Sequence, residues 1–324
     1  MYKASIIVPL HIINDAEHTK KFLGTFQRLN QSFEGDFLWY IDANGCDVET
    51  SNCLKNGLNG KNDVKLHVEE NGSRRLAMNR GLDFTRAFSL PYCIFLNDDV
   101  EPLETTFEAL IKVLSSGIPV AGSLSTPYPI PLDGIPSVKN SVSLVGELAF
   151  YNKGISSGAR TFRGDCYGMD TTFISEFPNV HSDDIYLRIL FHHRFGKEIP
   201  IADEAQVFRV HESRARDAVR RIQRYFEGRK QLRDYFIATD PNLALLFDRL
   251  VSTPELSTIE PLFFEARDRV RRLTQGKRRE SILETPELNR EYESFSDLAM
   301  LYLTLKRLKR GENVLTSGET MWKR

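Results

Sequence analysis

The sequence predicts an α/β protein with a helical C-terminal region, and three observations support this fold class. Short apolar runs alternate with helical patterns over residues 1–115, which is typical of parallel strands joined by crossover helices. Further strand-like runs follow in a mixed stretch from about Val142 to Val210. Beyond Glu212 the pattern is mainly helical. We therefore expect a sheet flanked by helices, followed by a helical region.

Four apolar runs in the first part of the chain predict buried strands, because they are rich in Ile, Val, Leu, Phe and Tyr. These strands are expected at Ala4–Pro9, Phe37–Asp42, Val64–Glu69 and Tyr92–Leu96. A helical pattern follows each of them, at about Glu17–Asn30, Glu49–Asn56, Ser73–Phe88 and Glu104–Ser115. Ser73 is placed to cap the third helix.

A proline-rich segment follows the fourth helix. It holds Pro119, Pro127, Pro129, Pro131 and Pro136, together with Gly122 and Gly134. Proline has no backbone N–H and disrupts both helices and central strands. We therefore predict a long loop from Pro119 to Pro136.

Composition narrows the class of protein. The 324 residues are 41% hydrophobic and 27% charged, which is typical of a globular protein. Because 43 basic side chains face 44 acidic ones, a dedicated nucleic-acid binder is not expected. The sequence has no apolar run of the roughly 18 residues that a membrane span needs, and no signal peptide is evident. Four cysteines without metal-binding spacing are expected to be reduced packing residues of a cytoplasmic protein: Cys46, Cys53, Cys93 and Cys166.

Polar segments follow three of the predicted strands, where open α/β sheets bind ligands. They are Pro9-Leu10-His11, Asp42-Ala43-Asn44-Gly45 and Asn97-Asp98-Asp99. Asp98 and Asp99 repel each other unless a positive charge intervenes. Mg²⁺ or Mn²⁺ would supply that charge and keep positions open for substrate phosphates. The alternative is a loop and N-cap cluster ahead of the helix near Glu104.

Another acidic pair and two basic segments complete the candidate groups. Asp183 and Asp184 precede an apolar helical run and suit either acid–base chemistry or a helix N-terminus. Arg74 and Arg75 begin the third predicted helix. Arg221 and Arg224 belong to the run Arg220–Tyr225. For all four arginines, a solvated helix face remains the alternative.

In their order and spacing, these motifs resemble the family-2 glycosyltransferases of the GT-A fold. The resemblance rests on Ser5–Pro9, Asp42–Asp47, Asn79–Gly81, Asn97–Asp99 and Asp183–Asp184, and it extends to Gln231. It implies a Rossmann-like mixed sheet and transfer of a sugar from a nucleotide diphosphate. It also implies a domain over residues 1–236, with a nucleotide-binding half (1–115) and an acceptor and catalytic half (116–236), followed by a helical region (237–324).

The resemblance also implies roles for individual residues. Asp184 would be the general base, with Asp183 the second choice, and Asp42 would accept a hydrogen bond from uracil N3–H. The cation, Mn²⁺ or Mg²⁺, would be held by Asp99 and His211. The alternative for His211 is an ordinary surface histidine without a ligand role. Asn97 replaces an acid of the family's motif, which we expect to weaken metal affinity. The donor nucleotide would contact Pro9, His11, Asp42, Arg74, Arg75, Asn97, Asp98, Arg221 and Arg224.

The expected activity is inverting transfer from a UDP-sugar to a hydroxyl of a saccharide or lipid-linked acceptor, as in polysaccharide biosynthesis. A nucleotidyltransferase and a noncatalytic sugar-nucleotide sensor or scaffold remain alternatives. The C-terminal helix at about Phe295–Arg310, which ends in basic residues, is expected to pack against the rest of the protein. The alternatives are contact with a second copy of the chain or with the inner face of a membrane.

Overall fold

The protein is built around one mixed eight-stranded sheet. The computed structural model describes residues 2–10, 16–33, 35–70, 72–127, 162–180, 182–209 and 215–251, with isolated positions between 260 and 310. The strand order is β3-β2-β1-β4-β7-β6-β8-β5. The strands are β1 (Ala4–Leu10), β2 (Phe37–Asn44), β3 (Val64–Glu69), β4 (Tyr92–Leu96), β5 (Val100–Pro102), β6 (Val120–Pro127), β7 (Cys166–Asp170) and β8 (Ile201–Arg209).

The first four strands form a parallel half of the sheet. β1 pairs in parallel with both β2 and β4, and β3 pairs in parallel with β2. The strand order therefore reverses between β1 and β4, which is where α/β sheets place their ligands. β7 runs antiparallel to β4 and β6, and β5 runs antiparallel to β8.

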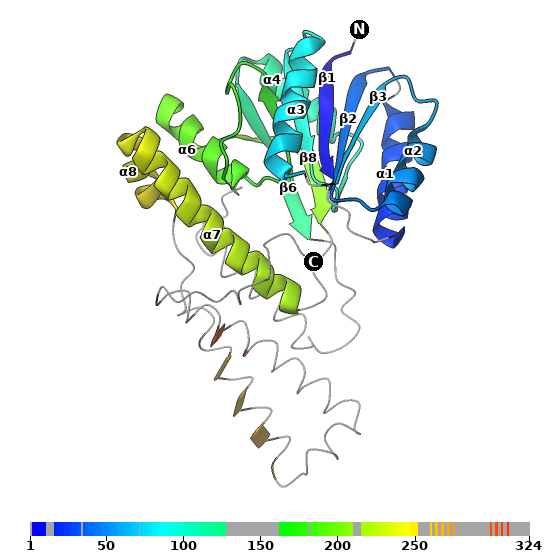
Figure 1. Ribbon diagram of the computed structural model, residues 1–324. Helices are drawn as coiled ribbons and strands as arrows, with labels where there is room; N and C mark the ends of the chain where they lie inside the picture. Colours follow the sequence, from blue (N-terminus) through cyan, green and yellow to red (C-terminus); the bar gives the residue numbers. More distant parts are fainter. Residues whose placement is uncertain are drawn as a thin grey trace.

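Helices cover both faces of the sheet (Figure 1). They are α1 (Ala16–Ser32), α2 (Val48–Leu58), α3 (Arg74–Ala87), α4 (Thr106–Ser115), α6 (Asp183–Phe195), α7 (Ala215–Thr239) and α8 (Pro241–Leu250). In β1, Ile6 and Val8 join the core formed with α1, α2 and α4. The intervening Ile7 joins the core formed with α3, α6, α7 and α8. This alternation follows from the two-residue period of a strand.

Helix α3 lies close to the sheet because of a glycine. A Cβ on Gly81 would meet the side chain of Ile7 in β1 at 2.4 Å, so a larger residue would push the helix outward. The helix begins at Ser73, whose hydroxyl accepts a hydrogen bond from the Leu76 amide at 3.3 Å. The predicted cap is therefore confirmed, and it fixes where the first turn of α3 meets the sheet edge.

The predicted α/β class is confirmed, and the four predicted strands and helices of the first half occur within two residues of their expected bounds. The predicted loop from Pro119 is wrong in its first part. Val120–Pro127 is strand β6, which lies between β7 and β8. The prolines stand at the two ends of this segment and leave Val120–Thr126 uninterrupted, so a strand can form there. The rest of the predicted loop lies outside the described residues.

Two expectations from composition can be compared with the structure. The four cysteines are free, and Cys46, Cys93 and Cys166 are buried, as packing residues should be. Among the described residues, no helix is long and apolar enough to cross a membrane.

Candidate functional site

The candidate site lies at the carboxyl ends of the parallel strands. Pro9 is buried in β1 and pairs in register with Asp42 of β2. Asn97 directly follows β4, and α3 begins beside the same edge. The sequence-predicted residues of the first half therefore come together because parallel strands end on the same side of a sheet.

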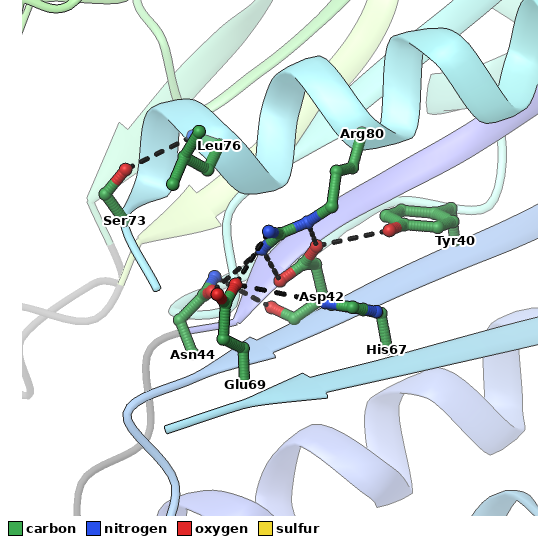
Figure 2. A network of polar contacts seen from close by, with 8 residues as sticks. All are labelled: Tyr40, Asp42, Asn44, His67, Glu69, Ser73, Leu76 and Arg80. Carbon is green, nitrogen blue, oxygen red and sulfur yellow. Dashed lines mark hydrogen bonds and ion pairs between the residues drawn. The ribbon is translucent and has the colours of Figure 1, made fainter. Parts of the chain in front are cut away.

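Asp42 forms the centre of a buried ion pair (Figure 2). Its side chain is 0% exposed, and Arg80 of α3 contacts both of its oxygens. Arg80 Nε donates to Oδ2 at 2.8 Å and Nη2 donates to Oδ1 at 3.1 Å. The Tyr40 hydroxyl donates to Oδ2 at 3.2 Å. Burial, and then the negative charge of Asp42, raise the pKa of Tyr40, so this hydroxyl stays protonated.

The segment Asn97-Asp98-Asp99 connects β4 to β5. The backbone amide of Asn97 donates a hydrogen bond to the backbone carbonyl of Asp165 at 3.0 Å, which fixes the start of the segment. Asp98 Oδ2 lies 3.3 Å from Nε2 of His18 on α1. Asp99 is exposed, and with Asp98 it lines a cleft of about 270 Å³ beside His18.

The alternative role for this segment was a loop and N-cap cluster: Asp98 and Asp99 do lie in a turn, but they do not cap the next helix. Strand β5 follows at once, and α4 begins later, at Thr106, with Thr105 as its N-cap. Asp98 and Asp99 are therefore held at the edge of the sheet by β4 and β5 and leave the cap of α4 to another residue.

Asp183 and Asp184 occupy the first turn of α6 but have different surroundings. Asp183 Oδ1 lies 3.4 Å from Nε of Arg74, and its Oδ2 accepts a hydrogen bond from the Tyr167 hydroxyl at 3.2 Å. Asp184 Oδ1 accepts a hydrogen bond from the Ile185 amide at 2.8 Å. No ion pair to Asp184 is present among the described residues. One carboxylate is therefore neutralised and the other is not.

The pKa of Asp184 is raised to about 6. Burial is the largest cause and the neighbouring negative charge of Asp183 is the second, while the Ile185 amide opposes them. The backbone of Gly164 lies against this side chain, since a Cβ there would come within 3.0 Å of the Asp184 Cβ. A carboxylate with a pKa near 6 is a better proton acceptor than an ordinary aspartate and is still mostly ionised at neutral pH.

Arg74 joins the two acidic segments. Its Nη2 donates to Oδ1 of Asn97 at 2.9 Å, and its Nε faces Asp183. A cleft of about 450 Å³ opens beside it, lined from α3 and from the segment before α6 by Ser73, Arg74, Arg75, Met78, Phe177, Pro178, Asn179, Val180 and Asp183. Segments 109 residues apart therefore meet at a concave surface that carries both charges.

The donor atoms suit a hard divalent cation only in part. Asp98 and Asp99 offer carboxylate oxygens, the ligands that Mg²⁺ and Mn²⁺ accept together with water and phosphate. Within the described ranges, no group of three or more His, Cys, Asp and Glu residues could hold a metal ion. Asp98 and Asp99 could therefore supply only part of a coordination shell, and water or substrate phosphates would have to supply the rest.

Some predicted site residues cannot be placed. His11 and His211 lie outside the described residues. Arg221 and Arg224 belong to α7, but their side chains also lie outside the described part. Arg75 lines the larger cleft, and its Nε is buried without a hydrogen-bond partner among the described residues.

Sequence reasoning missed several residues that the fold brings to the site. They are His18, Glu69, Asp165 and Tyr167. Arg80 belongs to the motif Asn79–Gly81, but sequence reasoning assigned it no role of its own. Asp165 Oδ2 is buried without a hydrogen-bond partner in the described part of the chain. Neither spacing nor composition marks these residues, because their partners lie far away in the sequence.

Comparison with known proteins identifies the fold as the GT-A fold. One similar structure is the mannosyltransferase PcManGT from Pyrobaculum calidifontis, solved with GDP-Man and Mn²⁺. The alignment covers 95% of this chain and 88% of PcManGT, at 12% sequence identity and a TM-score of 0.50. The predicted GT-A fold is thereby confirmed.

Two further solved structures align with lower scores. Glucosyl-3-phosphoglycerate synthase from Mycobacterium tuberculosis, solved with Mn²⁺, UDP and glucosyl-3-phosphoglycerate, covers 69% of this chain and 79% of its own, at 14% identity and a TM-score of 0.45. Residues 1–349 of TarS from S. aureus cover 99% and 98%, at 12% identity and a TM-score of 0.43. No protein-family model matches the sequence, and no curated protein matches it.

Proposed function

We propose that this protein transfers a sugar from a nucleotide-sugar donor, a UDP-sugar, to an acceptor hydroxyl with inversion at the anomeric carbon. The acceptor is a saccharide or a lipid-linked saccharide. The GT-A fold, the acidic segment after β4 and the acid pair at the start of α6 together support this proposal. The contrast between Asp183 and Asp184 is the observation that carries it.

Asp184 is the general base of the proposed reaction. Its raised pKa makes it an effective acceptor for the proton of the incoming hydroxyl. Asp183 is less suited to this task because Arg74 and Tyr167 already contact both of its oxygens. Asp183 instead keeps the pKa of Asp184 high through its own charge.

The donor lies along the carboxyl ends of the strands in this proposal. Its nucleoside is placed at the Asp42 end of β2, and its diphosphate beside Asp98 and Asp99. Arg75, which lines the larger cleft, is a further cationic group for the donor. Asp99, with Asp98, would hold Mn²⁺ or Mg²⁺ there, and the cation would neutralise the charge of the departing diphosphate. Arg74 keeps the two acidic segments at a fixed separation.

Inversion is part of the proposal because of the position that it assigns to the base. When Asp184 takes the proton of the acceptor hydroxyl on the face of the sugar opposite the diphosphate, the new bond forms as the old one breaks. A single in-line displacement of this kind inverts the anomeric carbon.

Nucleotide binding and donor hydrolysis test the proposal. UDP with Mn²⁺ should raise the thermal midpoint, since a ligand at one hundred times its Kd stabilises the folded state by about 2.7 kcal/mol. Without Mn²⁺ the shift should be much smaller. The wild-type protein should hydrolyse a UDP-sugar slowly without acceptor, and Asp99→Ala should not.

The exposed Asp234 of α7 supplies a control, because Asp234→Ala should behave as wild type. A protein that binds no nucleoside diphosphate under any of these conditions would contradict the proposal. Binding without turnover would favour a noncatalytic sugar-nucleotide sensor.

A further inference from the structure

The two oxygens of Asp42 are already occupied in the folded protein. Arg80 donates hydrogen bonds to both of them, at 2.8 and 3.1 Å, and the Tyr40 hydroxyl donates a third to Oδ2. The Asp42 side chain is 0% exposed. A nucleobase could reach this carboxylate only if the bidentate pair opened, and that would leave a guanidinium without its buried partner.

The outer end of the Arg80 side chain points toward Asn44 at the end of β2 and toward Glu69 at the end of β3 (Figure 2). Nη1 lies 2.6 Å from Oε2 of Glu69, and Nη2 donates to Oδ1 of Asn44 at 3.3 Å. Arg80 and Glu69 remain 28% and 37% exposed. Oε2 of Glu69, the atom that faces Nη1, is itself buried, so the exposed part of the Glu69 side chain lies away from this contact.

These contacts leave hydrogen-bonding capacity on both side chains. Arginine has five N–H donors, and hydrogen bonds to Asp42 and Asn44 use three of them. Nη1 carries the other two and forms an ion pair with Oε2 of Glu69. On Glu69, no hydrogen bond to Oε1 is present in the described part of the chain. A donor and an acceptor thus lie side by side at the nucleoside end of the proposed site.

We propose that Arg80 and Glu69 read the nucleobase of the donor, and that Asp42 is a positioning residue that holds Arg80 in place. This inference rests on the proposed function, since it concerns the donor of that reaction. Glu69 accepts a hydrogen bond from a ring N–H, and an N–H on Nη1 of Arg80 donates to the adjacent carbonyl.

The pair selects a lactam edge, in which a ring N–H stands next to a carbonyl. Uracil presents this edge at N3–H and C4=O, and guanine presents it at N1–H and C6=O. Cytosine and adenine in the same position would turn a ring nitrogen lone pair toward the carboxylate and an amino group toward the guanidinium. Both contacts would then be repulsive.

The experiment measures the dissociation constants of UDP, GDP, CDP and ADP with Mn²⁺ by calorimetry, for wild type and for Glu69→Gln. Wild type should prefer UDP or GDP over CDP and ADP by at least about tenfold, and the stronger of the two identifies the base. Glu69→Gln should lose most of this preference. Methylation of the ring N–H in the preferred nucleotide should weaken wild-type binding about tenfold and leave the variant unchanged.

Glu70→Gln is the matched control, because Glu70 is the next residue along the chain and is exposed. It should keep the wild-type preference. If wild type binds UDP or GDP and Glu69→Gln retains both the preference and the sensitivity to methylation, Arg80 and Glu69 do not read the base, while the proposed function stands. If wild type binds no nucleotide, both fail. A thermal melt of each variant without ligand establishes that it is folded.

Discussion

Two aspartates of this protein illustrate how differently one side chain can behave at two ends of a site. Asp42 of β2 is fully buried and bound by a bidentate guanidinium. Asp184 of α6 is partly buried, accepts one backbone hydrogen bond, and has a second carboxylate as its neighbour. The first therefore carries a neutralised charge, and the second carries a charge that the fold opposes.

The two environments suit one aspartate to stability and the other to chemistry. A buried charge with a good partner tolerates substitution poorly, because removing either partner leaves the other charge buried and uncompensated. A carboxylate whose pKa is raised by burial and by a like charge is ready to take a proton. We expect Asp42 to be important mainly for the fold and for positioning Arg80, and Asp184 mainly for turnover.

The largest effect is expected from Asp184→Asn. An amide cannot take the acceptor proton, so transfer should slow by about 10²- to 10⁴-fold, the usual contribution of a general base. UDP binding should remain within about threefold of wild type, because the base does not contact the nucleotide in this proposal. Initial rates and calorimetry measure the two quantities. If the variant lost UDP binding but kept the wild-type rate of transfer at saturating donor, Asp184 would instead be a residue that binds the donor.

Asp42→Asn should show the opposite behaviour and mainly change stability. The amide retains one acceptor oxygen but loses the charge that Arg80 requires. We expect the free energy of unfolding to fall by about 2 to 3 kcal/mol, less than for a pair that is buried on both sides. Urea denaturation measures this change. Asp83→Asn is the control on α3, since its exposed contact to Arg86 should be worth less than about 0.5 kcal/mol.

The pH dependence separates the two aspartates further. The pKa of Asp184 is raised in the folded state, so between its unfolded value near 4 and its folded value of about 6 the native protein binds more protons than the unfolded one. The contribution of this group to stability is therefore lost as pH rises through that window. The stability of Asp184→Asn relative to wild type should increase by on the order of 2 kcal/mol from pH 4 to pH 7. An increase with falling pH would mean that the Asp184 carboxylate is stabilised by the fold.

The strands could be predicted wherever a local pattern specified them. β1 and β4 are largely apolar runs, β3 alternates apolar with polar residues, and each was expected within one residue of its bounds. β5 has only three residues, Val-Glu-Pro, which is too short to form a pattern. β6 was hidden by the prolines around it, because counting prolines over a segment ignores which positions they leave free.

The candidate site was predictable only in its local motifs. Acidic residues after a strand or before a helix are visible in the sequence, as with Asp98 and Asp184. The partner of each carboxylate is not visible, because Arg80 lies 38 residues from Asp42 and Arg74 lies 109 residues from Asp183. Such pairs arise from how α3 crosses the sheet, and that crossing depends on close packing at Gly81.

The smallest predicted effect concerns Tyr40, which contributes one hydrogen bond to Asp42 and packs on Phe84 with ring centroids 5.1 Å apart. Tyr40→Phe keeps the packing and removes the hydroxyl, while Arg80 still neutralises the carboxylate. Unfolding free energy should fall by about 1 kcal/mol, the usual net value of one hydrogen bond. Tyr186→Phe is the control, since within the described residues its hydroxyl makes no hydrogen bond and its removal should cost less. Equal losses in the two variants would mean that Arg80 alone satisfies Asp42 and that the Tyr40 hydroxyl adds nothing to the pair.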